Sequence, residues 1–272
     1  MSFIQQDFQI INVIVTKNLK IKLRNRQTYL YSLGFPLLFT ILFYLMFKPM
    51  TVTISGITVF DMAVSGMLIY TASFGTINAA TSLTTEKERL TLTRLDTTPV
   101  GRGRIFFGTL LSESVFLIVQ LVLMFPISYG LLGAQWYNNN LNLLLLGFLI
   151  IFIFGLSTLG IGVIISAYAK SANAAVGFSM MYVMPIIFLS GAMIPFESPI
   201  VYLCPPFWVN QLYQQVIILG DDLWSDTLRL NSQNIFQAEF SIIPLWGSLV
   251  IILFILVATI FLGIKLFQKK TL

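Results

Sequence analysis

Few residues of this chain are of the types that carry out covalent chemistry, and one acidic residue stands alone in an apolar stretch. The sequence has no histidine and a single cysteine, Cys204. These counts exclude a zinc cluster, a Cys/His nucleophile and an intramolecular disulfide. Glu113 lies nine residues beyond Arg104 in the third of six apolar stretches. The chemistry open to such a carboxylate is electrostatic rather than covalent.

Glu113 needs a partner if its stretch crosses a membrane. An ionised acid at membrane depth costs about 2.5–3.5 kcal/mol, so the carboxylate must face an ion partner or water. Two interpretations are open: Glu113 lines a polar path through the membrane, or it bonds to a neighbouring helix. Gln120, two turns further along, presents the same choice.

The elements that position these residues are six apolar stretches, which predict an all-α integral membrane protein. Of the 272 residues, 57% are hydrophobic and only 10% are charged, whereas about a quarter are charged in a soluble domain. At 1.5 Å per helical residue, about 20 residues cross about 30 Å of hydrocarbon. The six predicted spans are residues 29–47, 61–83, 105–132, 141–168, 174–194 and 244–267.

The basic residues predict how this helix bundle is oriented. With six spans, fourteen of the 16 Lys and Arg residues fall on one side, and only Lys48 and Arg229 fall on the other. The positive-inside rule then places both termini in the cytoplasm. The net charge of +5 comes from residues beside the apolar stretches. This pattern indicates membrane orientation and argues against a nucleic-acid-binding domain.

Residues 1–26 show helical periodicity before the first span. Apolar residues recur every three or four positions from Ile4 to Leu23, and Lys17, Lys20 and Arg24 form a separate stripe. The pattern predicts an amphipathic interfacial helix along the inner leaflet. A plain cytosolic extension whose lysines fix the topology is the alternative.

The inner segment 85–104 is the most informative polar part of the chain. Charges of both signs alternate with leucines, and Thr98-Pro99 supplies an N-cap followed by a proline at the first helical position. We therefore expect a short surface helix that contacts a charged partner. A loop that only anchors the topology is the alternative.

Residues 88–95, with the sequence Glu-Arg-Leu-Thr-Leu-Thr-Arg-Leu, are followed by Thr98-Pro99-Val100. This run resembles the cytoplasmic signature of ABC-2 type permeases, E-R-G-T-L-E-R-L and then T-P-V. It departs at Leu90, where glycine is usual, and at Thr93, where an acid is usual. The resemblance implies a coupling helix between spans 2 and 3 that fits a separate ATPase subunit. The implied coupling residues are Glu88, Arg89, Arg94, Thr98, Pro99 and Arg102.

A second segment, Ser190-Gly191 followed by Pro195-Phe196, resembles the S-G-x-x-x-P element of the same family. In those permeases this element leads into short re-entrant helices that close an outer gate. The resemblance thus implies an outer gate at Gly191, Pro195 and Phe196, within an outer segment covering residues 195–243. An ordinary helix end followed by a surface loop is the alternative.

Together these features predict a single transmembrane domain, with an interfacial helix at 1–26, spans 1–5 within 29–194 and span 6 at 244–267. No P-loop pattern G-x-x-x-x-G-K-[ST] occurs in the sequence. The resemblance therefore implies an exporter permease in the plasma membrane that is not itself an enzyme. ATP and magnesium would be held by a partner ATPase, and a second permease copy would complete the path. An ATP-independent channel or secondary transporter is the competing hypothesis.

Overall fold

The computed structural model describes residues 3–24, 30–50, 57–88, 102–192, 199–224, 226 and 244–270. Every regular element in these ranges is a helix, and none of them contains a β-strand. Four helical segments are long and apolar enough to cross a membrane: Phe107–Leu131, Leu141–Tyr168, Ala172–Leu189 and Leu245–Gly263. The predicted all-α membrane class is confirmed at this level. A backbone in lipid must satisfy its own hydrogen bonds, which a helix does.

These four segments lie on α6, α7, α8 and α10. α6 (Arg102–Phe125) continues into the π-helical η2 (Pro126–Leu131), and α7 (Leu141–Tyr168) has the predicted bounds. α8 (Ala172–Leu189) ends before the predicted residue 194, and α10 (Leu245–Lys270) extends past residue 267. α8 ends early because Gly191 adopts a left-handed φ of 69° just after the helix cap.

The first predicted span is a shorter helix. α3 (Phe35–Phe47) follows the π-helical η1 (Leu30–Gly34), and its apolar helical run covers only Ser32–Phe47. A full span needs about 20 residues, so this segment by itself does not reach that length.

The second predicted span is the central helix of the bundle. α4 (Val59–Glu88) is longer than predicted, since the span was expected to end at residue 83 and the helix continues through Glu88. Nearly every residue from Phe60 to Ile77 is buried. α4 carries many Ser, Thr, Gly and Ala residues because it contacts protein on all sides instead of lipid.

α4 and α7 are joined by hydrogen bonds and by small residues. Thr158 Oγ1 donates to Ala72 O at 2.9 Å, and Thr76 Oγ1 donates to Thr158 O at 3.1 Å. A Cβ at Gly162 would lie 2.5 Å from Thr76 O, so only glycine allows the two backbones to approach this closely.

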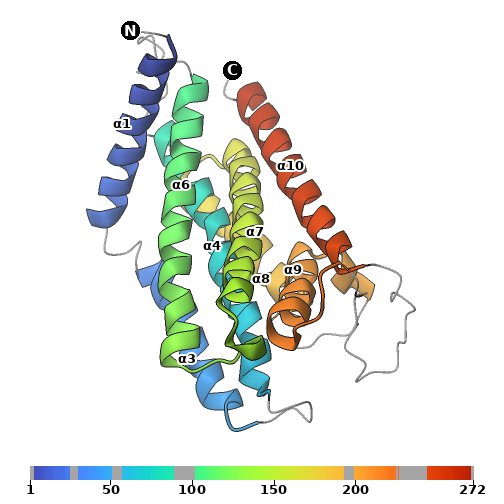
Figure 1. Cartoon of the computed structure of the whole chain (residues 1–272). Helices are drawn as coiled ribbons and strands as arrows, with labels where there is room; N and C mark the ends of the chain where they lie inside the picture. The colour runs from blue at the N-terminus through green and yellow to red at the C-terminus, as the bar shows by residue number, and fades with distance from the viewer. Residues whose placement is uncertain are drawn as a thin grey trace.

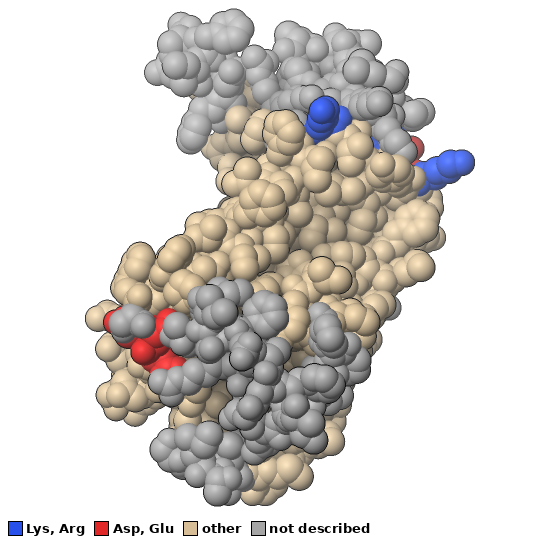
Figure 2. All heavy atoms as spheres, turned by 90° about the vertical axis from the view of Figure 1, so that its right-hand side faces the viewer, with Lys and Arg blue, Asp and Glu red and all other residues tan. Residues whose placement is uncertain are grey.

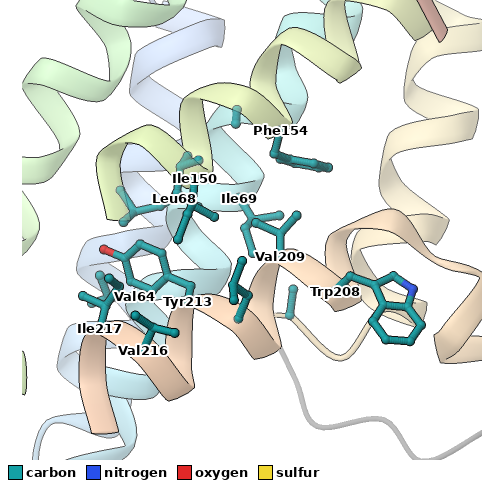
Figure 3. Close-up of a cluster of buried hydrophobic side chains, with 14 of the residues drawn as sticks. Val64, Leu68, Ile69, Ile150, Phe154, Trp208, Val209, Tyr213, Val216 and Ile217 are labelled. Carbon is teal, nitrogen blue, oxygen red and sulfur yellow. The ribbon is translucent and has the colours of Figure 1, made fainter. Parts of the chain in front are cut away.

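Short helices close the end of the bundle opposite the termini (Figure 1). They are η3 (Tyr137–Asn139), η4 (Pro199–Leu203), α9 (Pro205–Tyr213) and η5 (Gln214–Leu219). Figure 3 shows Val209 and Tyr213 of α9 packed among Leu68 of α4 and Ile150 of α7. The segment after α8 therefore folds back into the core.

The N-terminal helix α1 (Phe3–Arg24) lies lengthwise beside α6 (Figure 1). The predicted position of this helix along the inner leaflet stays a prediction; in the structure it runs alongside the first half of α6. Its outward face leaves Val13 and Ile21 exposed, at 68% and 50%. Polar contacts between the inward face of α1 and α6 explain this placement.

Candidate functional site: the charged end of the helix bundle

A group of charged side chains gathers where α4 ends. We call residues 82–88 the C-terminal end of α4. Its side chains contact α1, α6, α8 and the last turn of α7, and it leads directly into residues 89–101, which lie outside the described residues. One helix end is therefore joined to four neighbours at the point where the predicted coupling segment begins.

Glu113 on α6 is the centre of this arrangement. Its side chain is 1% exposed and forms an ion pair with Lys22 of α1, whose side chain is 10% exposed. Lys22 Nζ donates to Glu113 Oε2, and Ser82 Oγ of α4 donates to the other carboxylate oxygen, Oε1, at 2.7 Å. The Lys22 ammonium also lies 4.5 Å from the ring centre of Phe116, a cation–π distance. Glu113 thus connects three helices.

The same face of α1 makes two further contacts with α6, one helical turn apart. Asn18 Nδ2 donates to Thr109 Oγ1 and to Ser112 Oγ, both at 3.4 Å. One turn earlier, a Cβ at Gly108 would lie 2.8 Å from Ile14 Cγ2, so the absence of a side chain at Gly108 allows α1 to pack this closely against α6. Sequence reasoning missed Asn18 and treated Lys22 only as a topology signal. The available signal was the four-residue spacing of positions 14, 18 and 22 on a helix.

Three charged residues at the C-terminal end of α4 face different helices. Lys17 Nζ of α1 donates to Glu86 Oε1 at 2.9 Å. Lys87 Nζ donates to the Ser166 carbonyl in the last turn of α7. Glu88 Oε2 accepts from the backbone N–H of Ala172, the first residue of α8, at 3.1 Å. These side chains connect α4 to its neighbours by charge.

The site holds charges in place rather than presenting them for reaction. Both oxygens of the Glu113 carboxylate are engaged by Lys22 and Ser82. In the part of the chain that the structure describes, no group of three or more His, Cys, Asp or Glu side chains is placed to hold a metal ion. These contacts make Glu113 an interhelical bonding group, and the predicted role of Glu113 and Gln120 in a path through the membrane stays a prediction.

Gln120 of α6 forms a hydrogen bond with the backbone of η1. Its Nε2 donates to the Ser32 carbonyl of η1 at 3.0 Å. In a regular helix that carbonyl would accept from the N–H four residues later, but residue 36 is a proline and has none. Gln120 supplies a donor to this carbonyl from α6. Its Oε1 is buried and makes no hydrogen bond among the described residues.

Residues 9–217 match the family described as ABC-2 type transporter, which covers most of the chain. The chain belongs to the ABC-2 type transporter family. It is also 24% identical over 191 residues to a protein named "Probable multidrug ABC transporter permease YbhR" from Escherichia coli K12, and equally to its counterpart in Escherichia coli O157:H7. Each alignment covers 70% of this chain and 47% of the relative. The chain spans about half the length of the curated relatives it matches.

In this ABC-2 family member, two of the six predicted coupling residues flank segment 89–101 and four lie within it. Glu88 ends α4, and Arg102 begins α6. Arg89, Arg94, Thr98 and Pro99 lie outside the described residues, so their predicted role stays a prediction.

Of the three predicted outer-gate residues, only Gly191 lies among the described residues. Gly191 follows the C-cap of α8 and has the positive φ that favours glycine. Pro195 and Phe196 lie outside the described residues. The gating role of all three stays a prediction.

The first prediction concerns the Lys22–Glu113 pair. Lys22→Met or Glu113→Leu alone leaves a buried charge without its partner, and each should lower the free energy of unfolding by about 3–5 kcal/mol. The double variant should lose much less, because no buried charge is left. Thermal unfolding of the purified protein in mild detergent measures this, with Lys20→Met on the exposed face of α1 as the control. Additive losses in the double variant would contradict the pairing.

The second prediction concerns Gln120 and Pro36. Gln120→Leu should cost about 1–3 kcal/mol, since it removes a buried hydrogen bond to the Ser32 carbonyl. In a Pro36→Ala background the new N–H can donate to that carbonyl, so the same change should cost less. The difference between the two costs, measured by thermal unfolding, tests the explanation. An equal cost in both backgrounds would refute it.

Proposed function

We propose that this chain is the membrane-spanning permease subunit of an ATP-binding-cassette exporter. In this proposal it crosses the plasma membrane six times with both termini in the cytoplasm. It pairs with a second permease copy and is driven by a separate ATPase subunit that binds ATP and magnesium. The family match and the relative named as a multidrug permease support the transport role.

The observation that carries the proposal is the position of the C-terminal end of α4. Residue 89, where the family signature continues, follows directly after a helix end that is bonded to α1, α6, α7 and α8. An ATPase that displaced segment 89–101 would pull on this end first. Because interhelical hydrogen bonds and ion pairs join the end to four helices, the displacement would spread through the bundle.

The charge distribution supports the proposed orientation. On the face in Figure 2, the visible Lys and Arg side chains lie at the end that carries both termini, and most of the visible acidic atoms lie at the opposite end. This is the asymmetry of a bundle whose basic end faces the cytoplasm. In this orientation α9 and η5 enter from the outer side, as short re-entrant helices, and Gly191 lies at the outer end of α8.

The surface of the bundle supports the proposed surroundings. α10 exposes a continuous apolar face, and Phe254, Val257 and Phe261 are 72%, 66% and 64% exposed. α3 and α8 also expose large apolar side chains, such as Leu45 at 66% and Met181 at 79%. Surfaces of this kind need lipid or another protein to cover them. A drug-like, lipidic or glycan-linked cargo fits a path formed between two such bundles.

The competing hypothesis, an ATP-independent channel or secondary transporter, depends on an ionisable residue that is available to a cargo ion. Glu113 was the candidate for that role. The Lys22 ammonium and the Ser82 hydroxyl already engage its two oxygens. This hypothesis therefore gains no support from the described residues.

The third prediction tests the partnership. The tagged protein, purified in mild detergent from its native membranes, should bring with it a subunit that contains a P-loop and binds ATP. Reversing the charge at Arg89 and Arg94 to glutamate should remove that subunit without changing thermal unfolding of the permease. Lys170→Glu, an exposed basic residue on another loop, is the matched control. If no ATPase accompanies the unaltered protein, the proposed function is wrong.

The fourth prediction tests the orientation with single cysteines in a Cys204→Ser background. Leu141 and Lys170 flank α7 and are both exposed, and a 28-residue helix is about 42 Å long. A membrane-impermeant maleimide should label Leu141→Cys in intact cells and Lys170→Cys only after permeabilisation. The reverse pattern would invert the topology, and labelling of both from outside would show that α7 does not span the membrane.

A further inference from the structure

Two contacts at the C-terminal end of α4 reach the connection between α7 and α8. Lys87 and Glu88 are neighbours in sequence, yet they reach the two sides of one turn, the connection 169–171 between α7 and α8. Neighbouring residues point about 100° apart around a helix. The pair therefore straddles the turn.

Each contact matches the electrostatics of the helix end that it touches. The Ser166 carbonyl is one of the last four of α7, where no later helical N–H is available, and the Lys87 ammonium donates to it. Ala172 is the first residue of α8, where the backbone N–H groups lack helical acceptors, and the Glu88 carboxylate accepts from one of them at 3.1 Å. A cation at a helix C-terminus and an anion at a helix N-terminus are both favourable.

The turn's own hydrogen bonds leave the Ala172 N–H available to Glu88. Ser171 caps α8 by accepting from Ala174 N at 3.2 Å, so it satisfies the third residue of the helix and not the first. Ala169 N donates back to Ile165 O at 2.9 Å and closes α7. Glu88 thus completes the N-terminal cap of α8 from another helix.

We propose that Lys87 and Glu88 form a clamp that makes the α7–α8 turn move with the coupling segment. This inference rests on the proposed function and names the helix that responds: α8, through its first turn. Glu88 is the first residue of the family signature, and it acts as a positioning residue within the permease. A displacement of residue 89 moves Glu88, and with it the N-terminus of α8. The buried Glu113 pair holds α1 and α6 to α4 on the opposite side of the same helix end.

The test begins with the permease alone, which separates the clamp from the proposed function. Hydrogen exchange of the peptide covering residues 169–176 should be about two- to fivefold faster in Glu88→Ala than in the unaltered protein, and intermediate in Glu88→Gln, which keeps an acceptor oxygen but loses the charge. Glu86→Gln is the matched control, since it removes the same charge two residues away but faces Lys17. It should change exchange in α1 and leave residues 169–176 unchanged. Equal exchange in Glu88→Ala and the unaltered protein would overturn the clamp.

The second arm uses the complex with the ATPase subunit. Trapping that subunit with ATP and vanadate should change exchange both at residues 85–104 and at 169–176. In Glu88→Ala the change at 85–104 should persist, and the change at 169–176 should be lost. Lys87→Met should weaken it as well. A nucleotide effect on 169–176 that survives in both variants would overturn the transmission role. If no ATPase associates, the proposed function fails, while the first arm still decides whether the clamp exists.

Discussion

The structure depends on one constraint: α4 is enclosed by other helices, so its polar groups must be satisfied by protein. Water is not available inside such a bundle, and an unsatisfied polar group there is costly. Several hydroxyls of the helix meet this constraint by donating to carbonyls of α4 itself or of α7, and glycines allow α4 and α7 to pack closely. Ser65 similarly donates to Asn210 of α9 at 2.6 Å. The bundle is arranged around this helix.

The same constraint explains where the charges lie. An ionised side chain is tolerated inside the bundle only if its partner comes with it, and Lys22 meets this requirement for Glu113. α1 is held against α6 by this pair and by the Asn18 contacts one turn earlier. Apart from Asp61 in its first turn, the charges of α4 lie at its C-terminal end, where Lys87 and Glu88 reach the ends of α7 and α8. Polar contacts thus make one end of the bundle a connected unit.

Such an arrangement suits a subunit that transmits movement. A helix end bonded to four neighbours cannot be displaced alone, whereas a helix held only by apolar contacts can slide, because dispersion and packing are weakly directional. α10 differs from α4 in that most of its outer surface is apolar and exposed. The proposed function gives this mechanical difference a role in transport.

The sequence by itself determined the fold class, the bounds of α7 and most of the helical segments. It could do so because length and hydropathy are local properties, and lipid imposes the same requirement on every span. The signature at residues 88–100 likewise identified the family from residue types alone. The end of α4 was misplaced because Thr85-Glu86-Lys87-Glu88 looks like a polar loop until the partners of its charges are known.

Only the tertiary structure decided which polar residues meet. Lys22 and Glu113 are 91 positions apart, and Gln120 and the Ser32 carbonyl are 88 apart, so no local pattern pairs them. The tertiary structure also decided that α1 packs along α6. The apolar and basic stripes of α1 would fit a lipid surface as well as they fit a neighbouring helix. Periodicity shows which faces of a helix differ, but the partner of each face depends on how distant segments pack, and that is fixed by the whole bundle.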